Sequence, residues 1–270
     1  ANGSFDSSFG TNGFTITDLG HNTTDIGYSL AIQSDGKMVV AGDSYDKHNV
    51  YNAAIARYTK TGQLDSSFGI NGIVITDFGS SDDHCTSVAV QSNGKIIAAG
   101  FTGITPTHNF VIVQYNKNGT IDSSFGVNGF SIIDFGGADD KCNGMALQTD
   151  GKIVVGGHAG GDFAVARCKT DGTLDSSFGT NGKTTSDFGY PDVGYCLAIG
   201  SDGKIVLAGH SGTFVGVARY KGDGTLLSFT KQNITTMLAS IPLCWQAETN
   251  NTILQQPLIP ATPPQDFAFG

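Results

Sequence analysis

The sequence predicts an all-β protein with the architecture of a β-propeller of four-stranded antiparallel blades. Two short elements recur along the chain and set its period. The first, typified by QTDGKIVVGG, occupies residues 33–42, 91–100, 148–157 and 200–209. The second, DSSFG, ends at Gly10, Gly69, Gly126 and Gly179, a spacing of about 55 residues that lies in the range of propeller repeats. Segments with a 3.6-residue apolar period are absent, which excludes a helical solenoid.

Each period reads as four short strands, a to d. Strands a and b are joined by Asp-Gly or Asn-Gly, a pair that predicts a type I′ hairpin turn. Strands b and c are nearly continuous apolar runs, which indicates burial on both faces of a small sheet. Strand a is expected at 28–33, 86–91, 144–148 and 195–200, and strand c at 53–58, 110–115, 163–168 and 214–220. Strand d is expected at 13–18, 72–77, 129–134 and 182–187.

The chain opens on a strand d that has no strands a to c before it. The fourth a-b-c set is followed by the degenerate piece TLLSFTKQNITTML, in which Leu227 stands where the preceding repeat has Asp175. The economical solution is that residues 13–18 add to the fourth blade and close a four-bladed ring, which removes two unpaired strand edges. The alternative is an open half-ring that a partner chain completes to eight blades. Residues 1–229 are therefore assigned to the propeller.

The combined pattern of QxDGKIxxxG, xxARYxxDGxLDSSFG and NGxxxTDFG resembles the delta-60 repeat of the DUF5122 type. The placement of its hairpin is also similar to that of NHL repeats. The resemblance covers roughly residues 4–229 and implies a propeller fold. It implies no activity, because propellers host many unrelated roles.

Residues 230–270 form a non-repetitive extension with the single Trp and most of the prolines. Such a composition favours an extended segment over a helix. The segment could cover the channel or the fourth blade, add a strand to a neighbouring subunit, or be a disordered linker. The apolar side chains expected to act in assembly are Cys244, Trp245, Phe267 and Phe269.

The composition narrows the classes of partner and the setting. A formal charge of −9 argues against nucleic acid, and no apolar run reaches the roughly 18 residues of a membrane span. The absence of a signal segment before Ala1 suggests a processed form. Sequons for N-glycosylation predict an extracellular, cell-surface or particle-surface location. They lie at Asn2, Asn22, Asn118, Asn233 and Asn250.

The chain has five cysteines, an odd number, so one at least is free or pairs between chains. Cys85 and Cys142 occupy equivalent places in their repeats, and Cys168 stands where sister repeats have Tyr. We expect these thiols to be small buried hydrophobes. A Cys85–Cys142 disulfide is the alternative.

Propeller topology places the d–a and b–c loops at one end of the blades, and this end gathers acidic and His residues. One Asp precedes each strand a, at Asp25, Asp83, Asp140 and Asp192. A ring of these four carboxylates could hold a hard cation such as Ca²⁺ in the channel. Such residues also commonly bond local backbone N–H groups in turns. His84, His158 and His210 are further ligand-facing candidates.

The repeated DSSFG is predicted to be structural. Its Phe should fill space between blades, and Asp65, Asp122 and Asp175 should pair with Arg residues of strand c. Motifs of nucleophilic, phosphate-binding or zinc-dependent enzymes are absent, so an enzymatic role is open but not favoured. The favoured function is a non-enzymatic surface platform that assembles with itself, as an oligomer or filament, or binds another protein or glycan. The alternative is a cation-dependent hydrolase or lactonase.

Overall fold

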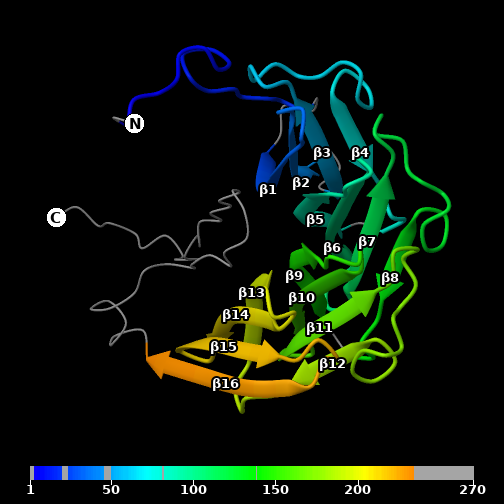
Figure 1. Ribbon diagram of the computed structural model, residues 1–270, viewed down its shortest axis with the longest axis vertical. Coiled ribbons are helices and arrows are strands. Elements are labelled where there is room, and N and C mark those ends of the chain that lie inside the picture. Colours follow the sequence, from blue (N-terminus) through cyan, green and yellow to red (C-terminus); the bar gives the residue numbers. More distant parts are fainter. Residues whose placement is uncertain (1–2, 20–23, 46–49, 81, 138, 234–270) are drawn as a thin grey trace.

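The computed structural model describes residues 3–19, 24–45, 50–80, 82–137 and 139–233. These residues form an all-β structure of four antiparallel four-stranded units, which we number as blades 1 to 4 (Figure 1). Among them, no helix has the length and apolar character needed to span a bilayer.

The strands follow the predicted a-b-c-d order in blades 1 to 3, and blade 4 has the same order with β16 as its strand d. Blade 1 contains β1 (Asp25–Ile32), β2 (Met38–Tyr45), β3 (Tyr51–Tyr58) and β4 (Ile73–Thr76). Blade 2 contains β5 (Asp82–Val90), β6 (Ile96–Gly103), β7 (Asn109–Tyr115) and β8 (Phe130–Ile133). Blade 3 contains β9 (Asp140–Leu147), β10 (Ile153–Ala159), β11 (Asp162–Cys168) and β12 (Lys183–Ser186). Blade 4 contains β13 (Asp192–Ile199), β14 (Ile205–Ser211), β15 (Phe214–Tyr220) and β16 (Leu226–Asn233).

The blades follow one another in an arc, with strands a on its inner side and strands d on its outer side (Figure 1). Blades 1 and 2 are linked by one parallel bridge, between Tyr51 and Asp82, so that they count as a single eight-stranded sheet. The described residues contain no strand pairing between blade 4 and blade 1. Figure 1 shows the arc open between β1 and β16, where the described residues of blade 4 do not reach blade 1.

Packing between blades follows one rule. Each blade has a forward face, turned toward the next blade, and a backward face, turned toward the preceding one. One core cluster joins Ile55 of the forward face of blade 1 to Tyr115 of blade 2, and a second joins Ile112 of blade 2 to Cys168 of blade 3. A third joins Val165 of blade 3 to Tyr220 of blade 4. The core of the protein thus lies between the sheets.

The DSSFG phenylalanines complete these clusters, as predicted. Phe68, Phe125 and Phe178 are at most 1% exposed and belong to the three clusters in turn. Each ring lies against a turn glycine of the following blade, so Phe125 meets Gly172. The glycine N–H that follows the Phe also bonds across the junction, as from Gly126 N to Asp171 O at 2.7 Å. The DSSFG segment of one repeat therefore fastens the next blade.

The a–b turns differ from the predicted type I′ geometry. In the first turn, Gly36 N donates to Gln33 O at 2.9 Å, and only Gly36 has a positive φ, of 82°. This is a type I turn over Ser34 and Asp35 followed by a left-handed glycine. The Asp35 carboxylate accepts the Lys37 N–H at 3.1 Å, so its side chain stabilises the turn without leaving the right-handed region.

Residues 13–18 do not provide the outer strand of blade 4, which corrects the predicted ring closure. That place belongs to β16, which pairs with β15 from Leu226 to Asn233. A tight turn bonded from Gly224 N to Lys221 O leads the chain straight from β15 into β16. Local pairing after such a turn costs far less loop entropy than pairing with a strand at the other end of the chain.

The N-terminal segment, residues 3–19, lies instead against blade 1 (Figure 1). Gly10 N donates to Thr61 O at 2.8 Å, and Tyr58 Oη donates to Thr17 Oγ1 at 2.7 Å. The same bonds join blade 1 to blade 2, from Gly69 N to Asn118 O and between Thr76 and Tyr115. The segment thus occupies the place of an outer strand d from a blade that would precede blade 1.

Candidate functional site

The four predicted Asp residues all lie at one end of the arc, which we call the loop end. Each begins strand a of its blade or lies next to its start, and each uses one carboxylate oxygen as a local cap. Asp83 Oδ2 accepts the Phe78 N–H at 2.6 Å, and Asp140 Oδ2 accepts that of Phe135 at 2.8 Å. Asp192 Oδ2 accepts the Phe188 N–H at 2.9 Å, and Asp25 Oδ2 that of Leu19 at 2.8 Å. This is the turn-capping role that the sequence offers as the alternative to a metal ring.

The second carboxylate oxygens differ from blade to blade. Asp83 Oδ1 accepts hydrogen bonds from Ser80 Oγ and Thr102 Oγ1, both at 2.5 Å. The equivalent Oδ1 atoms of Asp140 and Asp192 are buried without a hydrogen-bond partner among the described residues. Burial raises the pKa of both Asp83 and Asp140, although their hydrogen bonds act in the opposite direction.

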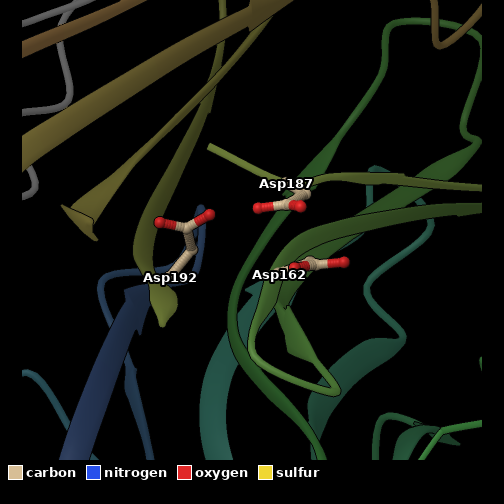
Figure 2. Close-up of side chains that lie close together, drawn as sticks. All are labelled: Asp162, Asp187 and Asp192. Atoms are coloured by element: carbon tan, nitrogen blue, oxygen red, sulfur yellow. The ribbon is translucent and has the colours of Figure 1, made fainter. Parts of the chain in front are cut away.

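The four carboxylates do not gather into one cluster. Within the described part of the chain, the group of three or more potential ligands that lie together is Asp162, Asp187 and Asp192. One carboxylate oxygen of each lies within 4.8 Å of the others, and all three come from the junction of blades 3 and 4 (Figure 2). Of the predicted ring, only Asp192 belongs to this group.

His84 lies within β5, where it packs between blades 1 and 2. Its Nδ1 is 2.5 Å from Asp43 Oδ2, and its ring stacks on Phe101 with centroids 4.3 Å apart. Asp43 also accepts the Cys85 N–H at 3.0 Å through Oδ1. Asp43 is 1% exposed, so these bonds supply the buried carboxylate with partners from the neighbouring blade.

His108 forms a second His–carboxylate group, one that the sequence does not predict. Its Nδ1 bonds Asp139 Oδ1, and its Nε2 lies 3.6 Å from Asp82 Oδ2. Lys141 Nζ is 3.0 Å from Asp139 Oδ2. Hydrogen bonds from His108 and Lys141 outweigh the effect of burial and lower the pKa of Asp139. The available signal is the repeated Asp-Asp pair, at Asp82–Asp83 and Asp139–Asp140, because the first member of each pair lies near His108.

His158 and His210 are equivalent residues of β10 and β14. His158 Nδ1 is buried without a hydrogen-bond partner among the described residues. Burial, with a smaller contribution from the charge of Lys141, lowers the pKa of His158 to about 4. His210 packs near Tyr195, with ring centroids 5.5 Å apart. At neutral pH His158 is therefore an uncharged ring within the sheet packing.

The predicted pairs of the DSSFG aspartates are confirmed in two blades. Arg57 Nε donates to Asp65 Oδ2 at 2.8 Å, and Arg167 Nε donates to Asp175 Oδ2 at 3.0 Å. In blade 2, Gln114 replaces Arg, and Lys95 pairs with Asp122. The equivalent lysines of blades 1 and 3, Lys37 and Lys152, also pair with the DSSFG aspartates of their blades. Arg219 pairs with Asp202, because blade 4 has Leu227 in place of the aspartate.

The remaining candidates concern cysteines, glycosylation and assembly. Cys85, Cys142 and Cys168 are buried free thiols, as expected, and the alternative Cys85–Cys142 disulfide is absent. Asn118 is exposed in the turn before β8, and Asn233 is the last residue of β16. The other predicted residues lie outside the described ones, namely Asn2, Asn22, Asn250, Cys244, Trp245, Phe267 and Phe269.

A groove lies at the opposite end of the arc, between the a–b turns of blades 2 and 3. It encloses 580 Å³ and is lined by polar side chains that include Gln91, Gln114 and Gln148. Titratable side chains that face one another at this end, such as Lys95 and Asp122, are already paired. The buried Asp and His atoms without a hydrogen-bond partner, among the described residues, include those of Asp140, His158 and Asp192 at the loop end.

Comparison with solved structures gives remote similarities. A virginiamycin B lyase from Staphylococcus aureus is 14% identical with a TM-score of 0.47, covering 80% of this chain and 58% of its own. A protein of unknown function from Bacteroides caccae is 10% identical with a TM-score of 0.45, covering 81% and 63%. A gluconolactonase from Xanthomonas campestris is 14% identical with a TM-score of 0.43, covering 79% and 78%. The chain thus spans less than two thirds of the length of the first two.

The comparison with curated proteins yields no match. A family model does match, described as a domain of unknown function (DUF5122) beta-propeller, over residues 33–68, 91–125, 148–178 and 200–226. Each match begins at an a–b turn, and the first three end at a DSSFG phenylalanine. The family unit is therefore the same repeat that the strands and turns define in the structure. The chain belongs to the DUF5122 β-propeller family.

Proposed function

We propose that this protein is a non-enzymatic assembly platform whose open arc is completed by a second copy of the chain. The observation that carries the proposal is the exposure of the forward face of blade 4. Val217 of β15 is 37% exposed, whereas its equivalents Ile55, Ile112 and Val165 are at most 1% exposed under the next blade. Blade 4 thus presents an interface surface that has no following blade within the described chain.

The backward face of blade 1 is open in the complementary way. Leu30 of β1 is 38% exposed, whereas the equivalent Val88 of β5 is 6% exposed in the cluster between blades 1 and 2. Burial of apolar surface of this kind stabilises an interface by about 25 cal/mol per Å² before the costs of association. An uncovered pair of apolar faces therefore favours a partner.

A second copy fits both faces because the chain already builds that junction three times. In every internal cluster, a forward face meets a backward face. The two uncovered faces are one of each kind, so copies would join head to tail. Such a heterologous contact gives a closed ring when its rotation closes and a filament when it does not. Two arcs of four blades would make the eight-bladed ring.

The N-terminal segment adds a condition to this junction. Within the chain, the strand d that bonds the next blade pairs with the outer edge of strand c of its own blade. If two copies join in the same way, the N-terminal segment of one copy would take this place on β15 of the other copy, where β16 already pairs. Most of β16 is exposed, with Leu226 at 40% and Leu227 at 42%. Copies that join in the internal geometry would therefore exchange β16 for residues 14–17 of their neighbour.

The test is the oligomeric state of the full chain as its concentration rises, followed by sedimentation velocity. Val217→Lys and Leu30→Lys each place a charge in one half of the proposed junction and should keep the protein monomeric at concentrations where the wild type associates. Ile132→Lys is the matched control, because Ile132 is 51% exposed on β8, away from both ends. A wild type that stays monomeric at all concentrations, or associates equally in all variants, would contradict the proposal.

The wider role stays a proposal in two respects. Binding of another surface protein or glycan, and an extracellular or particle-surface location, have the sequons as their support. Asn118 is exposed and suitable for modification, so secreted protein should lose mass on deglycosylation and Asn118→Gln should abolish that part. The cation-dependent hydrolase or lactonase has less support, because each predicted Asp ligand commits one oxygen to a backbone N–H. Lactone hydrolysis that depends on an added divalent cation would favour it instead.

A further inference from the structure

The junction of blades 3 and 4 carries an acidic cluster that differs from its counterparts. Asp162 begins β11, Asp187 follows β12, and Asp192 begins β13. One carboxylate oxygen of each lies within 4.8 Å of the other two. Figure 2 shows the three side chains meeting between the strands, with one oxygen of Asp192 directed toward Asp187.

Backbone hydrogen bonds fix two of these carboxylates in place. Asp187 Oδ1 accepts the Gly189 N–H at 2.6 Å, and Asp192 Oδ2 accepts the Phe188 N–H at 2.9 Å. Asp192 N donates to Gly161 O at 2.6 Å, which ties the turn before Asp162 to the start of β13. The cluster is therefore preorganised by the fold and does not depend on side-chain rotamers alone.

Two buried oxygen atoms at this junction lack any hydrogen-bond partner within the described residues. They are Asp192 Oδ1 and Ser211 Oγ, and both residues are 0% exposed. Ser211 is the residue opposite Asp192 in the register of β13 and β14. An unpartnered buried carboxylate oxygen is costly, and native proteins nearly always supply it with a donor or a cation.

The cluster also lacks a positive partner. In the described structure, Lys, Arg and His side chains form no ion pair with Asp162, Asp187 or Asp192. Three carboxylates thus repel one another across a partly buried site, which a divalent cation would relieve.

The two equivalent junctions each carry one carboxylate fewer. Asp140 Oδ1, between blades 2 and 3, is buried without a hydrogen-bond partner among the described residues, as Asp192 Oδ1 is, so it is the third carboxylate that sets blades 3 and 4 apart. Between blades 1 and 2, Asn52 replaces Asp162, and the hydroxyls of Ser80 and Thr102 bond the buried Asp83 oxygen. Between blades 2 and 3, Asn109 replaces Asp162, and Ala159 replaces Ser211.

A lysine also lies at the second of these junctions. Lys183 Nζ donates to Asp134 O at 2.6 Å, and its charge acts on Asp140. Among the described junctions, the cluster of three carboxylates without a nearby lysine is therefore found between blades 3 and 4.

We propose that Asp162, Asp187 and Asp192, with the hydroxyl of Ser211, bind a hard divalent cation of the Ca²⁺ class between blades 3 and 4. Carboxylate and hydroxyl oxygens suit Ca²⁺, whereas softer metals prefer the Cys and His ligands that this cluster does not contain. The ion draws its ligands from both blades and therefore pins them together. This site is distinct from a channel site shared by all four blades.

The experiment is calorimetric titration of the metal-free full chain with Ca²⁺, together with its thermal denaturation. One equivalent should bind with a dissociation constant of about 10⁻⁴–10⁻³ M, the range of extracellular Ca²⁺ modules, and should raise the melting temperature. Asp187→Asn should reduce the affinity at least tenfold, because it removes one charged ligand. Asp187 is exposed, so the substitution should leave the core intact. Asp134→Asn, the equivalent change between blades 2 and 3, should leave Ca²⁺ binding unchanged.

A second variant separates binding from folding. Asp162→Asn should abolish the Ca²⁺-dependent rise in melting temperature, yet without metal it should be at least as stable as the wild type, because it removes like-charge repulsion. The inference is overturned if millimolar Ca²⁺ gives neither heat nor a thermal shift. It is equally overturned if Asp187→Asn binds Ca²⁺ as tightly as the wild type and the control Asp134→Asn do.

Discussion

The guanidinium of Arg57 and the carboxylate of Asp65 form a buried ion pair, with Nε 2.8 Å from Oδ2. Arg57 Nη1 also donates to Lys117 O of blade 2 at 2.5 Å, and its guanidinium lies 4.5 Å from the centre of the Phe68 ring. Burial opposes ionisation of Asp65, but hydrogen bonds from Lys37 and Ser67 and the charge of Arg57 outweigh it and lower its pKa. One side chain thus links a turn, an aromatic ring and the following blade.

We predict that Arg57→Met lowers the free energy of unfolding by about 2–4 kcal/mol, because it removes the charged hydrogen bonds of Arg57 to Asp65 and to Lys117 O and leaves Lys37 as the remaining cationic partner of the carboxylate. Urea denaturation measures the change. The matched control is Arg219→Met. Arg219 occupies the equivalent place in blade 4, but its side chain is 48% exposed and pairs with the exposed Asp202. That control should cost less than about 1 kcal/mol. Equal losses in both variants would show that packing of the stem, and not the pair, accounts for the stability.

Stability should fall in mild acid because of His158. Its pKa is about 4 in the folded protein, against an ordinary value of 6.5. A lowered pKa means that the unfolded chain binds the proton first, so this contribution is complete above pH 6.5 and is lost as the pH falls through about 4. Replacement by Gln should remove up to about 3 kcal/mol of the pH-dependent loss.

Unfolding free energies of wild type and His158→Gln, measured from pH 7 to pH 4, check this prediction. A wild-type slope in His158→Gln would mean that other groups cause the acid sensitivity.

The glycine that receives each DSSFG ring should tolerate no side chain. A Cβ at Gly172 would lie 2.8 Å from Phe125 Cε1 and 2.9 Å from Gly126 N, at a φ of +86°. Gly189 has nearly the same φ, +85°, and a Cβ there would have no atom within 4 Å. We predict that Gly172→Ala destabilises the protein by about 1–3 kcal/mol more than Gly189→Ala, because the backbone strain is shared and only the overlap differs. Melting temperatures of the two variants give the comparison, and similar values would refute a packing role for the junction.

Deletion of residues 1–19 should destabilise blade 1. It removes the bonds from Gly10 to Thr61 and from Tyr58 to Thr17, and it uncovers the turn at Gly62, which lies against Phe9. At about 0.5–1.5 kcal/mol for each hydrogen bond, with the lost ring contact, the expected cost is about 2–4 kcal/mol. Thermal denaturation measures it, and Tyr58→Phe should reproduce only the part due to one bond. A truncated chain as stable as the full one would show that the N-terminal segment is not integral to the fold.

The sequence predicts the blades well because each is specified locally. Alternating turns and apolar runs fix strands such as β2 and β3 without reference to distant residues, and the Arg57–Asp65 pair follows from positions in one repeat. The predicted turn type is wrong because Asp35 can stabilise a right-handed turn through its side chain, an energy that the Asp-Gly pair alone does not reveal.

Long-range relationships are harder to predict. Residues 13–18 resemble strand d in sequence, yet only an isolated bridge from Thr11 to Phe14 forms there, since a strand also requires a neighbouring edge. Likewise Asp162 and Asp192 belong to different blades, and only the packing of blades 3 and 4 brings them together. The sequence shows His108 only as a loop residue, because its carboxylate partners, Asp82 and Asp139, come from two further segments.

The family repeat begins at the a–b turn, whereas each blade begins at strand a, so the repeat and the structural blade are out of phase. Every boundary between blades is bridged by a contact from the DSSFG segment of one blade to the c–d turn of the next, from Phe68 to Gly119 at the first boundary and from Phe178 to Gly224 at the third. Gain or loss of a whole repeat would change the number of blades while leaving both ends of the array the same. Repeat number, without any change to the interface, would then determine how far round a circle the protein reaches.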